Sequence, residues 1–297
     1  MPTPEWLADQ FEQHRGHLRA VAYRMLGSTT EADDAVQESW IRLGRTDVSD
    51  VGNLRAWLTT VVARVCLDLL RARTSRREDP LDADADVHVP DPLIARADRN
   101  QEAEALLADS VSLALLVVLE KLEPAERLAF VLHDVFGMTF DEIAPVVERT
   151  PVATRQLASR ARRRVQGQAP SSETDRREQR RVLDAFLAAA RDGDFEGLVS
   201  VLHPDIVLRA DAGPIAGMSR VVRGAEAVAS QATMFSQSAL VNEIVLVNGA
   251  LGILARRPDG RPFSVLGFTI VDGRIVEINI LADPQRVGRL DVSALDA

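Results

Sequence analysis

Apolar side chains recur with a helical period along the first 77 residues. Gly27 is expected to end a first helix, and Ser28 with Glu31 is a capping-box pattern for the start of a second. A third helix is predicted from about Asn53 to Arg73. The core-facing positions predicted for the three helices are Leu7, Phe11, His14, Leu18, Val21 and Met25, then Ala32, Val36, Trp40 and Leu43, then Leu54, Leu58, Val62, Val65 and Leu69.

The second of these helices carries acidic and amide side chains that capping and core packing do not explain. Acids in a first helical turn complement the helix dipole, which accounts for Glu31 and Asp33. Asp34, Gln37 and Glu38 lie on another face of the helix, where they are available to a partner.

A change of composition follows the third helix. Residues 78–104 contain nine acids, two arginines and three prolines. This composition predicts an acidic linker that is poorly ordered in its first half.

The next segment predicts a helix-turn-helix. Thr139 with Glu142 is a second capping box, and Thr150 before Pro151 is an N-cap residue followed by proline at the first helical position. The second helix carries basic and hydroxyl side chains along one face and ends in "RARRRV". Pro145 is expected to kink the first helix, because proline lacks a backbone N–H.

The pattern changes again after a short hinge. An amphipathic helix with Val182, Phe186, Leu187 and Ala190 precedes strand-like and helix-like segments, and three apolar runs near the C-terminus alternate with turns. The turns are hairpin signals, namely Asn248-Gly249, Asp259-Gly260 and Asp272-Gly273. We predict an α+β domain with a curved antiparallel sheet and helices on one side. The expected divisions are residues 1–77 and 102–168 as helical domains, 78–101 as the linker, 169–175 as the hinge and 176–297 as the α+β domain.

The bulk composition suits a multidomain cytoplasmic protein. A chain of 297 residues should form two or three domains. The single cysteine, Cys66, excludes a disulfide within the chain, and its apolar surroundings predict a core position. The apolar run from Leu113 to Leu119 is too short to span a bilayer, and the first ten residues lack the basic segment of a secretory signal. We therefore expect no membrane association.

Positive charge is concentrated in two blocks, although the formal net charge is −9. Residues 51–77 hold six arginines and one acid, Asp68, and residues 149–164 hold six arginines and no acid. The rest of the chain carries −20, because the two blocks together contribute +11. Two basic blocks in an acidic chain predict a polyanionic partner.

These motifs together resemble those of a known family. Residues 32–40 approximate AEDxVQExW and residues 56–71 approximate AWLxxxxARxxxDxLR, which are motifs of region 2 of extracytoplasmic-function (ECF) sigma factors. The helix-turn-helix is similar to region 4 of the same proteins, and the third domain to the SnoaL-like, NTF2-like cone. The order of parts resembles the subgroup of sigma factors that has a C-terminal SnoaL-like extension.

The resemblance implies that core RNA polymerase and promoter DNA are partners. The polymerase contacts would be the beta-prime clamp helices and the beta flap, with Asp34, Gln37, Glu38 and Arg42 facing the clamp helices. Capture of an unstacked base needs cations and a pocket, which agrees with Arg64, Asp68 and Arg71 at one-turn spacing. The predicted DNA contacts are these three residues and Arg73, Arg76, Arg77, Thr154, Arg155, Ser159, Arg160, Arg162, Arg163 and Arg164. Thr154 and Arg155 would lie nearest base edges.

The subgroup also has a linker motif rich in Trp and Pro, a DGGGK loop and an NPDKL loop. The corresponding stretches are "VPDPL" at 89–93, "DAGPI" at 211–215 and "DPQRV" at 283–287, and all three depart from the motifs. The resemblance implies regulatory loops that include Asp211, Gly213, Asp283 and Pro284.

Two alternative functions stand beside that of a sigma factor. A SnoaL-like enzyme would need a carboxylate or histidine of shifted pKa inside the cone, and the nearby candidates are His203, Asp205, Arg209 and Asp211. The predicted inward positions Val265, Gly267, Thr269 and Ile278 are mostly apolar, so we expect no catalysis, cofactor or metal. A dry cone could bind a small apolar ligand. The other alternative is a DNA-binding regulator that never contacts polymerase.

Overall fold

The computed structural model describes residues 4–46, 51–77, 87–97, 111–166, 176–214, 218–236 and 239–296. Its contacts divide the chain into two compact units. The first unit contains residues 1–82 and 118–168, and the second contains residues 83–117 and 169–297. The residues between the two helical domains are therefore divided, and most of them group with the C-terminal domain.

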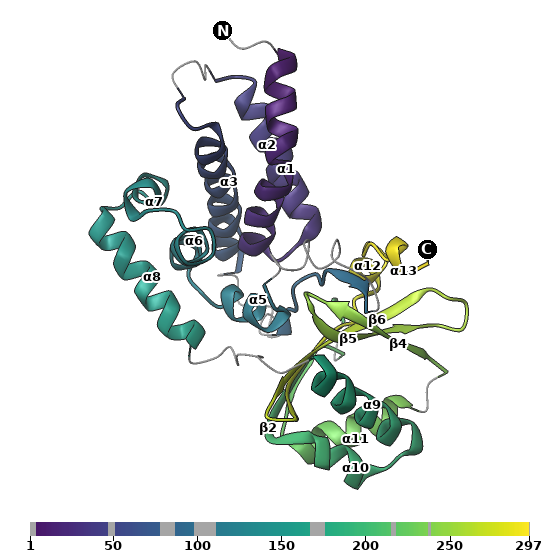
Figure 1. The fold of residues 1–297 in the computed structure, drawn as a ribbon. Coiled ribbons are helices and arrows are strands. Elements are labelled where there is room, and N and C mark those ends of the chain that lie inside the picture. Colours follow the sequence, from purple (N-terminus) through teal and green to yellow (C-terminus); the bar gives the residue numbers. More distant parts are fainter. Residues whose placement is uncertain are drawn as a thin grey trace. The chain divides into compact units, whose positions relative to one another are not determined.

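The first unit is all-helical, as predicted (Figure 1). Its elements are α1 (Pro4–Leu26), α2 (Thr29–Leu43), α3 (Leu54–Arg77), α6 (Pro124–Phe130), the π-helix η2 (Val131–Val135), α7 (Phe140–Val147) and α8 (Pro151–Gln166), while α5 (Leu113–Glu120) crosses the boundary between the units. Helices α1, α2 and α3 pack on one another, and α7 and α8 form the predicted helix-turn-helix. The π turn after α6 has no counterpart in the predicted pattern.

The helix starts confirm most of the predicted capping. Ser28 caps α2 by accepting from the Glu31 N–H at 3.5 Å, but the Glu31 carboxylate pairs with Arg73. Thr139 and Glu142 form a complete capping box at the start of α7. Pro145 lies inside α7, and Glu148, the C-cap residue of this helix, is in the left-handed region with φ of 57°.

Cys66 confirms its predicted core position in the first unit. The side chain is buried and free of any disulfide. Burial disfavours the thiolate and raises the pKa of the Cys66 thiol to about 12. Its role in this environment is that of a small apolar side chain.

The second unit is built on one seven-stranded sheet with the order β1-β4-β5-β6-β7-β2-β3. The strands are β1 (Ile94–Arg96), β2 (Leu202–Asp211), β3 (Arg220–Arg223), β4 (Val241–Val247), β5 (Ala250–Arg256), β6 (Pro262–Val271) and β7 (Arg274–Leu281). The sheet is not wholly antiparallel as predicted, because β2 runs parallel to β7. The three predicted hairpin turns are present, with φ of 83° at Gly249 and Gly260 and 71° at Gly273.

Helices cover one face of this sheet (Figure 1). They are α9 (Arg176–Asp192), α10 (Phe195–Val201) and α11 (Ala225–Ser236), while the short α12 (Pro284–Val287) and α13 (Ser293–Asp296) follow the last strand. Phe186 of α9 packs on Phe268 of β6 with ring centroids 5.6 Å apart. The α+β fold class is therefore confirmed.

The register of β6 and β7 corrects the predicted inward positions. Phe268 pairs with Ile278, and both join the core beneath the helices. Side chains alternate between faces along a strand, so Val265, Gly267 and Thr269 lie on the opposite face. The prediction was right for Ile278 and wrong for these three residues.

The segment between the helical domains contributes the edge strand β1. Its residues pair with β4, with Ile94 opposite Val247. The Leu93 N–H donates to the Asn248 side chain at 3.0 Å, and this side chain donates in turn to the Val111 carbonyl at 3.1 Å. The first half of the acidic linker, predicted to be poorly ordered, lies outside the described residues over 78–86, as does the hinge at 169–175. Its last residues contradict that prediction, because Val87 and Val89 are buried. Among the helices described, none is long and apolar enough to cross a membrane.

Candidate nucleic-acid interface

The predicted polymerase-facing residues share a surface on α2. Asp34 and Gln37 are exposed, and Arg42 donates from Nε to Glu38 Oε1 at 2.9 Å. This ion pair is itself largely open to solvent, since both side chains are 43% exposed. Ile41, 40% exposed, adds an apolar side chain beside them that the sequence analysis did not single out.

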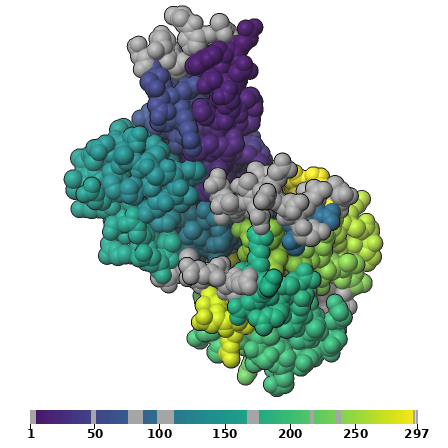
Figure 2. Space-filling model, in the orientation of Figure 1, coloured from purple at the N-terminus to yellow at the C-terminus, as the bar shows by residue number. Residues whose placement is uncertain are grey.

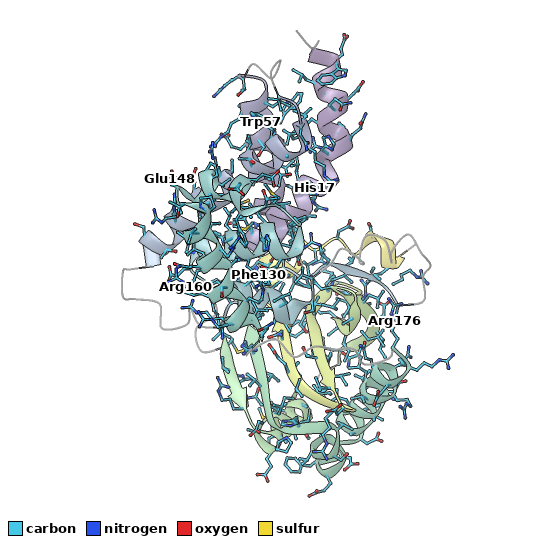
Figure 3. The ribbon with its side chains drawn as sticks, turned by 60° about the vertical axis from the view of Figure 1, so that its left-hand side comes forward. His17, Trp57, Phe130, Glu148, Arg160 and Arg176 are labelled. Atoms are coloured by element: carbon cyan, nitrogen blue, oxygen red, sulfur yellow. The ribbon has the colours of Figure 1, made fainter. Side chains whose placement is uncertain are left out.

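The predicted base-capture residues lie along one exposed face of α3. Arg64, Asp68 and Arg71 are all exposed, which agrees with their one-turn spacing. Arg64 also donates from one guanidinium nitrogen to the Pro145 carbonyl oxygen of α7 at 3.3 Å. Trp57, labelled in Figure 3, is half-buried on the same helix.

The arginines that follow Arg71 along α3 have different surroundings from the exposed face. Arg73 pairs with Glu31 and donates to the Leu26 carbonyl oxygen at 3.3 Å. The structure thus gives Arg73 contacts with α2 and with the end of α1 that were not predicted from the sequence. The side chains of Arg76 and Arg77 lie outside the described residues.

Helices α7 and α8 form a lobe that is open to solvent, teal in Figure 2. Arg155 and Ser159 of α8 are exposed, as the sequence analysis expected. Thr154 is a correction, because its side chain is fully buried and its hydroxyl donates to the Thr150 carbonyl at 3.0 Å. It packs α8 against the domain and is not available to a base edge.

Three of the predicted DNA contacts on α8 are held by acids of the same lobe. Glu126, whose side chain is only 5% exposed, accepts from Arg164 at 2.8 Å and pairs with Arg160 at 3.3 Å. Arg162 donates from Nε to Asp134 at 2.9 Å. Arg163 is exposed, and no ion pair is found for it within the described parts of the chain. Figure 3 shows Arg160 on α8 and Glu148 at the turn before that helix.

A buried arginine links the two helical domains. Arg127 of α6 donates from two nitrogens to the Arg24 carbonyl oxygen of α1, both at 3.2 Å. Desolvation lowers the pKa of Arg127 to about 10, so the side chain stays charged at neutral pH. The Phe136 ring, which follows η2, also contacts α1, with Arg24 over the ring at 4.8 Å and His17 edge-on at 5.3 Å. These contacts hold η2 and α6 against α1.

In the second unit, the three stretches predicted as regulatory meet at Arg286. Arg286 donates to Asp91 at 2.8 Å, to Asp211 at 2.7 Å and to the Val89 carbonyl at 2.5 Å. The Asp211 carboxylate also accepts from the Val89 N–H at 3.0 Å. Segment 89–93 is therefore fixed to the domain through Arg286, a residue that the sequence analysis did not select.

Gly213 and Asp283 complete the same cluster. A Cβ atom at position 213 would lie 2.3 Å from the Asp283 carboxylate, and φ is 65° there, so glycine is required. Asp283 caps α12 by accepting from the Gln285 N–H at 2.8 Å, and Pro284 occupies the first helical position. The four predicted loop residues are thus placed together.

The acid and base candidates for catalysis are not gathered in the core. Arg209 pairs with Glu277 and lies next to Leu208 in β2, so it occupies the sheet face opposite the helices. Asp211 shares that face and is engaged by Arg286, while the His203 Nδ1 accepts from the Asp205 N–H at 3.1 Å. In the part of the chain that the structure describes, no cluster of His, Cys, Asp and Glu is placed to hold a metal ion.

Comparison with known families identifies the class. The family model of Sigma-70 region 2 matches residues 10–76, and that of Sigma-70 region 4 matches residues 112–165. These ranges cover the three-helix domain and the helix-turn-helix. The chain belongs to the family of ECF RNA polymerase sigma factors, which direct transcription initiation.

Individual relatives match across nearly the whole chain. The sequence is 36% identical to ECF RNA polymerase sigma factor SigJ of Mycobacterium tuberculosis (strain ATCC 25618 / H37Rv), covering 93% of this chain and 92% of that protein. It is also 36% identical to the probable sigma factor SigI of M. tuberculosis (strain CDC 1551 / Oshkosh), covering 93% of each. The crystal structure of M. tuberculosis SigJ superposes with a TM-score of 0.73 and 32% identity over 96% of this chain and 99% of that one. The C-terminal domain is therefore shared with relatives of this family.

Proposed function

We propose that this sigma factor is regulated by its own C-terminal domain through the segment that precedes region 4. The observation that carries the proposal is Arg286, which binds segment 89–93 and the Asp211 loop together. The same segment continues into β1, an edge strand of the C-terminal sheet. Region 2 and region 4 are joined through this segment, so its docking limits how the two regions can separate to reach two promoter elements.

The same proposal assigns individual residues to contacts with polymerase and DNA. The exposed α2 surface with Asp34, Gln37, Glu38 and Arg42 faces the beta-prime clamp helices, and region 4 meets the beta flap. Arg64, Asp68 and Arg71 take part in base capture at the downstream promoter element, and α8 enters the major groove of the upstream element. The bond from Arg64 to Pro145 favours a closed arrangement that has to open before Arg64 reaches DNA.

The proposed role of the C-terminal domain is regulatory and not catalytic. Its helix-covered face is filled by packed apolar side chains such as Phe186 and Phe268, while Arg209 and Glu277 pair on the other face. This arrangement supports a scaffold, because acid–base chemistry needs polar groups facing a bound substrate. A small apolar ligand of this domain stays a prediction.

Run-off transcription with core polymerase on genomic DNA tests the proposal. We compare the full chain with a chain that ends at Gln168 and expect transcription from the cognate promoter to change severalfold, since coupling of this kind is typically worth about 1–3 kcal/mol. Equal yield and equal salt dependence of the two chains would contradict it. A pull-down with core polymerase, run in parallel, separates loss of polymerase binding from a change in promoter use.

A further inference from the structure

Arg155 has a different partner from the three ion-paired arginines of α8. Its guanidinium carbon lies 5.4 Å from the centroid of the Phe140 ring, at the start of α7. Arg160, Arg162 and Arg164 are instead held by the carboxylates of Glu126 and Asp134. A carboxylate takes one or two of the five N–H donors of an arginine, whereas an aromatic ring attracts the cation through its π-electrons and takes none of them when the guanidinium lies over the ring. The ring therefore restrains Arg155 while leaving N–H donors for another acceptor.

The Phe140 ring is itself held in place by a second aromatic ring. It stacks on the His133 ring with centroids 3.9 Å apart and an interplanar angle of 30°. His133 Nδ1 lies 2.8 Å from the Met138 carbonyl oxygen. Since a carbonyl only accepts, Nδ1 carries the hydrogen and the orientation of the imidazole is fixed. The π turn η2 contains His133, and the capping box at Thr139 and Glu142 fixes the first turn of α7.

This stack matters for base reading because arginine is a flexible side chain. A bidentate contact with guanine O6 and N7 requires two N–H donors in a set direction. An unrestrained arginine side chain loses considerable rotamer entropy when it adopts that direction. A side chain that is already restrained before binding loses less. Arg155 lies in the second turn of α8 and is exposed, where a helix in the major groove presents its base contacts.

We propose that Phe140, supported by His133, is a positioning residue that sets the guanine preference of Arg155 at the upstream promoter element. The proposal rests on the proposed function, in which α8 reads that element. Phe140 itself contacts no base. It acts by holding the guanidinium in the direction of the guanine edge, so its effect is confined to the base pair that Arg155 reads.

The test measures base preference with holoenzyme formed from the full chain and core polymerase. A promoter library randomised at the upstream element is selected with wild type, Arg155→Ala, Phe140→Leu and Phe140→Tyr. Arg155→Ala identifies the position at which guanine preference is lost. We expect Phe140→Leu to reduce guanine preference at that same position by about two- to fivefold, the range that an exposed cation–π contact provides, and Phe140→Tyr to retain it.

The results distinguish the positioning role of Phe140 from base reading by Arg155. If Arg155→Ala removes a preference that Phe140→Leu keeps in full, the positioning role is wrong and base reading by α8 stands. If Arg155→Ala changes no preference, base reading by Arg155 fails and the positioning role fails with it. Thermal unfolding of each variant controls for folding, and Phe140→Met replaces Phe140→Leu if the leucine variant is unstable. An equal loss of preference at every position with Phe140→Met would also overturn the proposal, because a structural defect has no single target base pair.

Discussion

The arginines of α8 and Arg286 show two uses of the same side chain. Arg160 and Arg164 share the carboxylate of Glu126, but their own side chains remain about half exposed, at 54% and 50%. Arg286 is 19% exposed and joins two carboxylates and a backbone carbonyl. The first arrangement leaves positive charge at the surface, and the second uses the charge to close a loop cluster. Partners and exposure, and not the number of arginines, distinguish the two arrangements.

The largest effect is expected at Arg286. Arg286→Ala leaves the carboxylates of Asp91 and Asp211, which are 10% and 8% exposed, without their cation. We expect the free energy of unfolding of the C-terminal domain to fall by about 3–5 kcal/mol, as when one partner of a buried pair is removed. Denaturant unfolding of the full chain measures this. Arg180→Ala is the matched control, since its pair with Asp184 is 53% exposed on both sides and should be worth less than about 1 kcal/mol.

The acidic surface of α2 is a third arrangement of charge, and we expect it to act on the rate of association with core polymerase. Asp34→Lys with Glu38→Lys should slow association with core polymerase by about tenfold or more at low salt, because rim charges steer encounter. The fold should hold, since neither side chain is buried. Stopped-flow binding gives the association rate, and thermal unfolding gives the control. Association at the wild-type rate would remove this surface from the polymerase interface.

Glu126 provides a test of whether the arginines that pair with it also contact DNA phosphates. Glu126→Gln removes the shared carboxylate from Arg160 and Arg164. Loss of a charged hydrogen-bonding partner in a buried position should cost about 1–3 kcal/mol of stability. The released arginines should raise the salt slope of DNA binding by about one to two units. A fall in stability with an unchanged slope would show that these arginines do not reach phosphates.

The smallest effect is expected at Arg163. Arg163→Ala should weaken binding to specific and scrambled DNA evenly and lower the salt slope by about one unit, as expected for a single phosphate contact. Fluorescence titrations at several salt concentrations measure the slope. A selective loss on the specific sequence would instead make Arg163 a base-reading residue.

Local signals in the sequence predicted the helices and hairpins well. The capping box at Thr139 and Glu142 and the turn at Asp272-Gly273 depend on residues a few positions apart, and both are present. β1 was not predicted, because three residues carry no period and its partner Val247 lies far along the chain from Ile94. The parallel pairing of β2 with β7 is likewise a property of the whole sheet.

The roles of the site residues could be predicted only in part. Exposure at Arg64 and Arg155 follows from helical spacing. Burial of Thr154 depends on how α8 packs against the rest of its lobe, and the pairing of Arg164 depends on Glu126, 38 positions away. Arg286 and Asp91 are 195 positions apart, so no local pattern links them. Motif spacing thus locates a surface, while tertiary contacts decide which of its side chains are free to bind.

The central claim is that Arg286 couples the C-terminal domain to promoter use, and run-off transcription from the cognate promoter tests it most directly. Full-length wild type, Arg286→Lys and Arg286→Ala are compared at equal concentrations of holoenzyme, with Arg180→Ala as the surface control. The account predicts that Arg286→Ala reproduces part of the severalfold change caused by ending the chain at Gln168. Arg286→Lys should fall between Arg286→Ala and wild type, because lysine keeps the charge but cannot reach all three partners. If Arg286→Ala transcribes with the same yield and salt dependence as wild type while the shortened chain does not, the coupling does not run through Arg286.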